Sequence, residues 1–155
     1  MRLLCCLDGT NIEQISKAVS TMLQSNSLTI GLLYVIDSGP HGEMERQRER
    51  FLRGPHPPTA RQEQMRQAEK ASAQDILTEG ARYVQGAEQL QREGRPEREI
   101  VQCATDWAAD LIIICPRSPL NPGPPSGPKS VGHVARFVLD HAPCAVLLVR
   151  GNALI

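Results

Sequence analysis

Unbroken apolar runs alternate along the chain with segments whose apolar residues recur at helical spacing. An apolar run without polar interruptions is typical of a strand covered on both faces, because no position on such a strand can face water. A more polar stretch after Gly86 predicts an edge strand. The expected strands are residues 3–7, 28–36, 87–93, 111–115 and 145–149.

Helix-forming stretches separate these runs, and each carries one apolar face. Asn11 and Gln14 predict a capping box at the start of the first helix. The second helix runs from about Thr59 to Val84, the third follows Pro96, and Pro143 ends the fourth. The inward residues are expected to be Ile12, Ile15, Val19, Met22 and Leu23; Met65, Ala68, Ile76, Gly80 and Tyr83; Ile100, Ala104, Trp107 and Ala108; and Val131, Val134, Ala135, Val138 and Leu139.

Strict alternation with short connections predicts an α/β fold, a single doubly wound five-stranded parallel sheet with helices on both faces. Two strand orders are common. The order 2-1-3-4-5 suits a receiver or flavin module, but a receiver needs an acidic pair near the first strand, an Asp ending the third and a Lys ending the fifth. The sequence lacks these residues. We therefore expect the order 3-2-1-4-5, in which Asp8 faces the loop after Cys115 across the point where the order reverses.

Composition excludes several classes of partner. The 17 basic and 17 acidic residues balance, and only two Phe, two Tyr and one Trp are available for base stacking, so we expect no nucleic-acid partner. The five cysteines lack CxxC spacing and the four histidines form no ligand pattern, which argues against a metal site. Asp8 interrupts the first apolar run too early for a signal peptide, and later runs are too short to cross a membrane. A cytoplasmic protein with reduced thiols is expected.

Two segments break the pattern. Residues 37–58 contain Gly, Pro and the charged stretch EMERQRERFLR, in which Met44 and Phe51 could face inward on a short helix. This segment is interpreted as a solvated surface excursion, with a peptide- or membrane-docking role as the alternative. Residues 116–130 form a proline-rich inserted loop.

The stretch AADLIIIC, the loop after it and GHVARFVLDHAPCAVLLVR resemble the universal stress protein family, as does CLDGT at the first strand. The resemblance covers nearly all of residues 1–155 as one domain, with 37–58 in the family's variable region. It implies a stress-response module that binds ATP or another adenine nucleotide and dimerises through the last strand, here Ala145 to Val149.

Family members that bind ATP use an Asp after the first strand, a Val near the end of the second and a loop of the form G-x2-G-x9-G-[ST]. Carried over by position, these residues and their neighbours form the candidate cofactor site. The candidate residues are Asp8, Val35, Ile114, Cys115, Arg117, Ser118, Gly132, His133 and Val134.

The loop departs from this motif. Cys115 and Ser118 replace its first two glycines, His133 replaces the hydroxyl residue, and the spacing to Gly132 is four residues too long. A phosphate loop presents backbone N–H groups, which proline lacks. The loop prolines are Pro116, Pro119, Pro122, Pro124, Pro125 and Pro128. The segment GPPSGPKS resembles a Walker loop only superficially, because its spacing is wrong. What remains for an anion is the start of the last helix with Arg117, Lys129 and His133.

Three functional hypotheses follow. The first is a non-enzymatic regulatory or binding module with a reshaped, weak adenine-nucleotide pocket and no catalytic residues. The second keeps ATP binding, with slow or no hydrolysis, through Asp8 and the residues around Gly132. The third is thiol chemistry at Cys115 paired with His133, against which a packed thiol and a capping histidine are the simpler interpretation. Asp8 itself could be a turn former.

Overall fold

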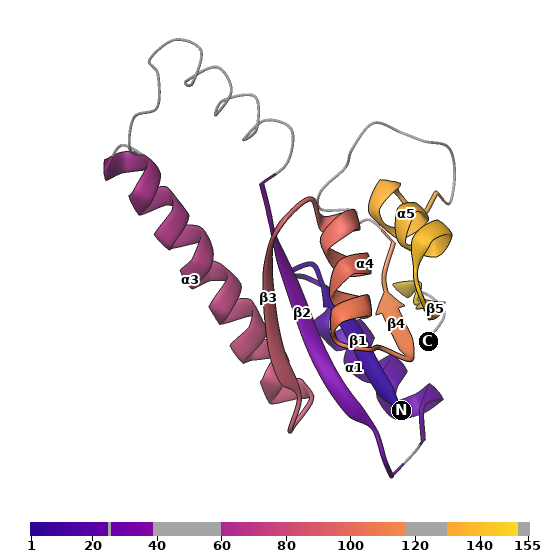
Figure 1. Cartoon of the computed structure of the whole chain (residues 1–155). Coiled ribbons are helices and arrows are strands. Elements are labelled where there is room, and N and C mark those ends of the chain that lie inside the picture. Colours follow the sequence, from indigo (N-terminus) through magenta and orange to yellow (C-terminus); the bar gives the residue numbers. More distant parts are fainter. Residues whose placement is uncertain (25, 39–59, 117–129, 152–155) are drawn as a thin grey trace.

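The computed structural model describes residues 1–24, 26–38, 60–116 and 130–151. Strands and helices alternate along the described chain (Figure 1). The strands are β1 (Arg2–Leu7), β2 (Thr29–Asp37), β3 (Glu88–Gly94), β4 (Leu111–Ile114) and β5 (Ala145–Leu148). The helices are α1 (Ile12–Met22), α3 (Ala60–Tyr83), α4 (Pro96–Asp106) and α5 (His133–His141).

The five strands form one parallel sheet in the order β3-β2-β1-β4-β5, which confirms the predicted fold class and strand order. All carboxyl ends therefore lie along one edge of the sheet. The order reverses between β1 and β4, where Cys5 lies beside Ile113. Crossover helices leave in opposite directions from such a point and open a crevice between them.

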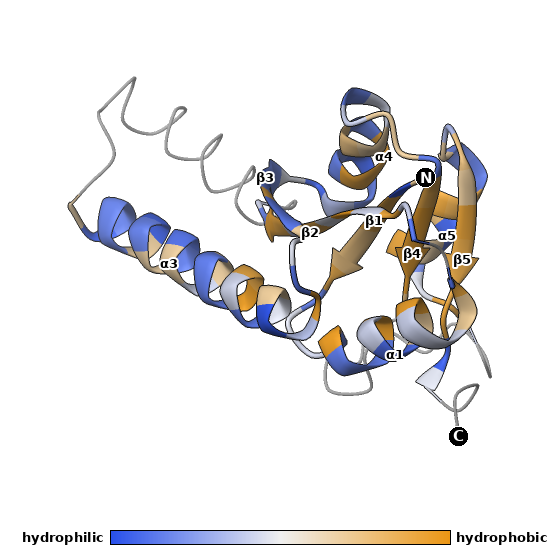
Figure 2. Cartoon of the chain, turned by 90° about the horizontal axis from the view of Figure 1, so that it is seen from below, coloured by the Kyte–Doolittle hydropathy of each residue, from blue (hydrophilic) through white to orange (hydrophobic). Residues whose placement is uncertain are grey.

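Helices cover both faces of the sheet, α1 and α3 on one and α4 and α5 on the other (Figure 2). Strand β1 is apolar at every position from Leu3 to Leu7, and the packing of these residues explains why. Leu4 and Cys6 pack towards α4 and α5, whereas Leu3, Cys5 and Leu7 pack towards α1 and α3. An apolar run without alternation is what such a two-sided position requires.

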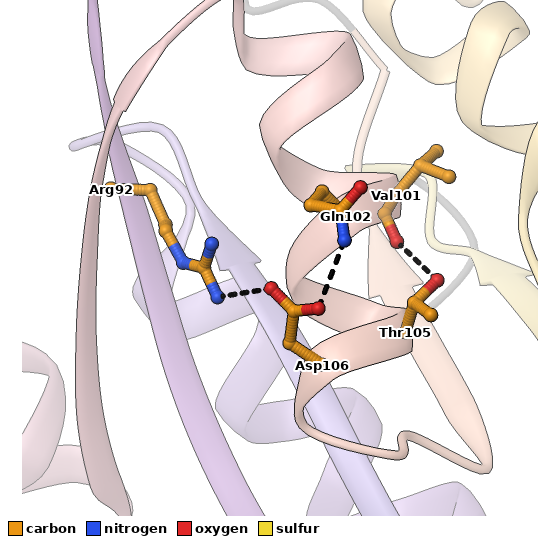
Figure 3. Close-up of polar contacts among 5 residues, drawn as sticks. All are labelled: Arg92, Val101, Gln102, Thr105 and Asp106. Carbon is orange, nitrogen blue, oxygen red and sulfur yellow. Dashed lines mark hydrogen bonds and ion pairs between the residues drawn. The ribbon is translucent and has the colours of Figure 1, made fainter.

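The edge strand β3 is held by polar contacts to α4 (Figure 3). The Arg92 guanidinium donates to Asp106 Oδ2 at 3.0 Å, and Gln102 Nε2 donates to Asp106 Oδ1 at 2.9 Å. These two hydrogen bonds, Gln102 first, lower the pKa of Asp106. Polar side-chain contacts thus add to the packing of Leu90 in holding this edge strand.

Several predicted inward residues face solvent instead. Met65 and Tyr83 are exposed on α3, where Ala73, Leu77 and Gly80 make the buried contacts. The first half of α3 extends beyond the sheet in Figure 1, and Met65 and Ala68 belong to this half. Tyr83 lies in the last turn, where its hydroxyl donates to Glu13 Oε1 at 3.2 Å instead of packing inward. The stripe predicted for α3 was therefore wrong at Met65, Ala68 and Tyr83, which are all exposed.

Three further inward assignments were also wrong. Met22 and Leu139 are 53% and 46% exposed at the outer ends of their helical faces. Ala108 is exposed and has a φ of 54°, because the chain has already left α4 and turns there into β4. The segments 39–59 and 117–129 lie outside the described residues, so the surface role of 37–58 and the inserted loop at 116–130 stay predictions.

Candidate functional site

A cavity of about 670 Å³ lies at the carboxyl edge of the sheet where the strand order reverses. It is bounded by the ends of β1, β2 and β4 and by the first turns of α4 and α5. The described lining residues are Cys6, Leu7, Asp8, Thr10, Asn11, Leu33, Tyr34, Val35, Asp37, Pro96, Ile100, Ile114, Cys115, Pro116, Val131, Gly132, His133, Val134 and Ala135.

All the candidate site residues that the structure describes line this one cavity. They come from β1, β2, β4 and the start of α5, and they are Asp8, Val35, Ile114, Cys115, Gly132, His133 and Val134. Arg117 and Ser118 lie outside the described residues. The fold therefore brings together positions that are more than 120 residues apart in sequence, as Asp8 and His133 show.

Asp8 shapes the turn that opens this cavity. Its Oδ1 accepts hydrogen bonds from the Thr10 backbone N–H at 2.7 Å and from the Thr10 hydroxyl at 2.8 Å. Gly9 between them has a φ of 92°, a conformation that glycine adopts without the strain of a side chain. Asp8 is a turn former and also a cavity residue.

Asn11 ties this turn to β1, and sequence analysis gave it a different role. It is 5% exposed and occupies the N-cap position of α1, but its side chain makes no capping hydrogen bond. Its Oδ1 accepts from the Asp8 N–H and its Nδ2 donates to the Cys6 carbonyl, both at 3.0 Å. Gln14 donates to the Val149 carbonyl at 3.1 Å. The predicted capping box is therefore wrong, because both side chains bridge to strands or strand ends.

Cys115 lies between the end of β4 and the cavity. Burial raises the pKa of its thiol to about 11; a hydrogen bond with Asn11 opposes this shift and the negative charge of Asp8 adds to it. A nucleophilic cysteine needs a lowered pKa, because the thiolate is the reactive species. The His133 Nε2 lies 3.4 Å from Glu97 Oε1, across the gap between α5 and α4. These two observations speak against a thiolate–imidazole pair.

The start of α5 forms the opposite wall. Gly132 is its N-cap, with a φ of 86° and an extended ψ, a region of backbone space that is essentially restricted to glycine. The Gly132 N–H donates to Ser130 Oγ at 3.3 Å. His133, the first residue of α5, is largely exposed at the rim of the cavity.

The charges on the described part of the cavity wall are mainly negative. Among the described lining residues, Asp8 and Asp37 carry carboxylates, His133 carries an imidazole, and none is a lysine or arginine. Tyr34 lies at the acidic end, where burial first and then the charges of Asp8, Asp37 and Glu69 raise its pKa. The described wall therefore suits a ligand that donates hydrogen bonds better than it suits a polyphosphate.

No group of three His, Cys, Asp or Glu residues in the described ranges could hold a metal ion. No helix in the described part is long and apolar enough to cross a bilayer. All five cysteines are free thiols.

The model of one protein family, described as the universal stress protein family, matches residues 1–150. This chain belongs to the universal stress protein family. The match spans every described strand and helix, and it confirms the resemblance carried by the first strand and the segment from Ala108 to Arg150. No curated protein matches the chain.

Several solved structures of universal stress proteins share the fold. UspA from Lactobacillus plantarum is 21% identical, with a TM-score of 0.65 and 97% of each chain covered. A family protein from Arabidopsis thaliana, solved with AMP bound, is 18% identical, with a TM-score of 0.61 and coverage of 99% of this chain and 93% of that chain. One from Archaeoglobus fulgidus, in complex with dAMP, is 17% identical, with a TM-score of 0.53 and coverage of 96% of this chain and 97% of that chain.

Sequence reasoning missed four polar side chains of the universal stress protein cavity, those of Thr10, Asn11, Tyr34 and Asp37. For Asp37, its place at the end of a predicted strand was the signal that could have identified it. Asp37 follows an apolar run directly, as Asp8 does, and the carboxyl ends of neighbouring parallel strands meet at one edge. The interpretation of 37–58 as a variable surface segment obscured that signal.

Proposed function

We propose that this universal stress protein is a non-enzymatic regulatory or binding module of the stress response whose cavity holds an adenine nucleotide weakly. The observation that carries the proposal is the cavity at the reversal of strand order, with Asp8, Val35 and Gly132 on its wall. Neighbours in the family bind AMP and dAMP, which supports the same class of ligand here.

Weak binding follows from the groups that would meet a phosphate chain. The described wall offers the backbone at Gly132 and the imidazole of His133, while Arg117 and Lys129, the cations expected near an anion, lie outside the described residues. The motif hydroxyl is replaced by His133, and six prolines stand in the segment from Pro116 to Pro128. Since prolines donate no hydrogen bonds, fewer amides are available to a triphosphate. The base and sugar therefore provide most of the affinity.

Calorimetric titration tests this proposal. Wild-type protein is expected to bind AMP and Mg-ATP with similar dissociation constants, weaker than about 100 μM, equivalent to about −5.5 kcal/mol. Asp8→Ala is expected to weaken both, whereas Asp140→Ala removes an exposed carboxylate that is not part of the described cavity wall and leaves binding unchanged. Micromolar binding of Mg-ATP, or steady release of phosphate from it, would favour the ATP-binding alternative and overturn the weak, non-enzymatic pocket.

The proposal includes a homodimer formed through β5. This strand lies at one edge of the sheet, and its residues Val146, Leu147 and Leu148 are apolar and only partly buried. An apolar sheet edge invites pairing with another chain, and a two-fold antiparallel pairing of two copies would cover both edges. Sedimentation velocity at micromolar concentration is expected to give a dimer of twice 17.0 kDa, and a monomer would contradict this part of the proposal.

A cytoplasmic location completes the proposal. The five free cysteines fit a reducing compartment, and buried thiols such as Cys5 and Cys6 act there as small apolar side chains. Fractionation of cells that produce the tagged protein is expected to recover it with cytosolic markers. Recovery with membranes or in the medium would contradict the location.

A further inference from the structure

The cavity wall carries a second carboxylate that the family's nucleotide motif does not include. Asp37 is the last residue of β2 and lines the cavity together with Asp8, which directly follows the neighbouring strand β1. It stands two residues after Val35, and residues two apart on a strand point to the same face. A ligand that reaches Val35 therefore has Asp37 beside it, about 6.6 Å further along the strand.

Asp8 has limited capacity for a ligand because its turn uses one of its oxygens. Both hydrogen bonds that Asp8 accepts within the described chain, from the Thr10 N–H and the Thr10 hydroxyl, end on Oδ1. The lone-pair positions left on Oδ2 serve one ligand group, so further donor groups of the ligand need acceptors elsewhere. Asp37 supplies them, since a carboxylate has about four lone-pair positions and can accept from a ligand in addition to a protein partner.

Asp8 and Asp37 line the same cavity from the ends of neighbouring strands. Their negative charges, together with that of Glu69 on α3, act on the Tyr34 phenol and raise its pKa after the larger effect of burial. Carboxylates only accept hydrogen bonds, and like charges at one end of a cavity repel a phosphate. The group that fits between them is a neutral donor pair, and the ribose 2′,3′-diol is the donor pair of a nucleotide.

We infer that Asp37 is a specificity residue that accepts hydrogen bonds from the ribose diol of the bound nucleotide, an inference that rests on the proposed nucleotide function. The sheet order supports the same placement. In dinucleotide-binding sheets with this order, an acidic residue beyond the first helix hydrogen-bonds the ribose 2′-hydroxyl. Asp37 selects ribonucleotides over deoxyribonucleotides and excludes nucleotides that carry a 2′-phosphate.

The test measures, by calorimetry, the dissociation constants of four nucleotides for four forms of the protein. Some nucleotides lack one ribose hydroxyl, and some protein variants lack one carboxylate. The ligands are AMP, 2′-deoxy-AMP, 3′-deoxy-AMP and adenosine 2′,5′-bisphosphate, and the proteins are wild type, Asp37→Ala, Asp37→Asn and Asp140→Ala. A hydrogen bond to a charged group contributes about 1.5–3 kcal/mol, so loss of the bonded hydroxyl is expected to weaken wild-type binding about tenfold or more. Asp140→Ala is the charge-matched control and is expected to behave like wild type.

The variants decide the outcome. In Asp37→Ala, AMP and its deoxy analogues are expected to bind alike within about twofold, because the acceptor is gone. Asp37→Asn keeps the shape of the side chain and is expected to bind the 2′-phosphate ligand better than wild type does. If wild type binds AMP and both deoxy analogues equally, the inference is wrong while the proposed function stands. If wild type binds none of these nucleotides, the proposed function fails and the inference with it.

Discussion

The Asn11 side-chain oxygen accepts a hydrogen bond from the Asp8 backbone N–H at 3.0 Å, while its amide nitrogen donates to the Cys6 carbonyl. A single buried side chain thus fixes the turn that places Asp8 at the cavity. The same side chain opposes the rise that burial causes in the pKa of the Cys115 thiol, just after the end of β4.

Asn11→Ala is expected to destabilise the protein by about 1–3 kcal/mol, because it leaves the part-buried Asp8 N–H and the buried Cys6 carbonyl without this partner. Urea unfolding followed by circular dichroism measures this free energy. Ser20→Ala removes an exposed hydroxyl on the same helix and serves as the control. Its free energy of unfolding is expected to stay close to that of wild type, as for most surface substitutions. An Asn11→Ala variant as stable as this control would show that the bridge is not structural.

Gly132→Ala tests the opposite wall of the cavity. A residue with a side chain is strained by about 1–3 kcal/mol at this backbone conformation, so α5 is expected to start differently or the fold to lose that stability. Thermal unfolding and AMP titration of the same variant separate these effects. An alanine variant with wild-type melting temperature and wild-type affinity would contradict the role given to Gly132.

Gly31→Ala tests the packing of β2 against the single tryptophan. An added Cβ would lie 3.0 Å from a ring carbon of Trp107 and 3.1 Å from Leu90 Cδ1, closer than ordinary contacts. Overpacking of this kind costs about 1–3 kcal/mol. Trp107 is held on its other sides by Glu88 at 2.9 Å and by the Arg2 guanidinium at 4.0 Å, so it has little room to move.

Tryptophan fluorescence during chemical unfolding measures the effect of Gly31→Ala. The variant is expected to unfold at lower denaturant concentration and to show altered native emission, because the added Cβ displaces the Trp107 ring. Gly86→Ala provides a contrast, because nothing lies within 4 Å of its added Cβ but its φ is 76°. It is expected to cost about 1 kcal/mol through backbone strain without changing the emission. Unchanged emission and stability in Gly31→Ala would contradict the packing.

The fold was predictable because the central strands of this sheet are apolar on both faces. Residues 3–7 and 111–115 define β1 and β4 within one residue at each end. The burial of Met65 was not predictable. Periodicity marks the apolar face of a helix, but it does not say whether the sheet is long enough to cover that face. The role of Asn11 was hidden for a related reason, since capping is a local pattern and its actual partner, Cys6, lies on another element.

We expect the Cys115 thiol to lower the free energy of unfolding at alkaline pH. Its pKa in the folded protein is about 11, above the ordinary value of 9.0, so the folded state holds the proton more tightly than the unfolded chain does. The stabilisation is therefore complete below pH 9 and is lost as the pH rises through about 11. Cys115→Ala is expected to flatten this decline when urea unfolding is followed across that pH range, and an unchanged slope would contradict the assignment.

The rate of alkylation measures the reactivity of the same thiol independently. A pKa of about 11 in place of 9.0 leaves about a hundredfold less thiolate at neutral pH. Iodoacetamide is therefore expected to modify Cys115 far more slowly than a small free thiol, as measured by peptide mass spectrometry. Rapid and selective modification would revive the thiol-enzyme alternative.

The most direct test of the account is a nitrogen–proton NMR titration of the protein with AMP. The amide signals of Asp8, Val35, Cys115 and Gly132, which line one cavity, are expected to shift in fast exchange. The indole signal of Trp107, a residue at the opposite edge of the sheet, is expected to stay unchanged. Shifts centred on other residues, or none at millimolar AMP, would contradict the account.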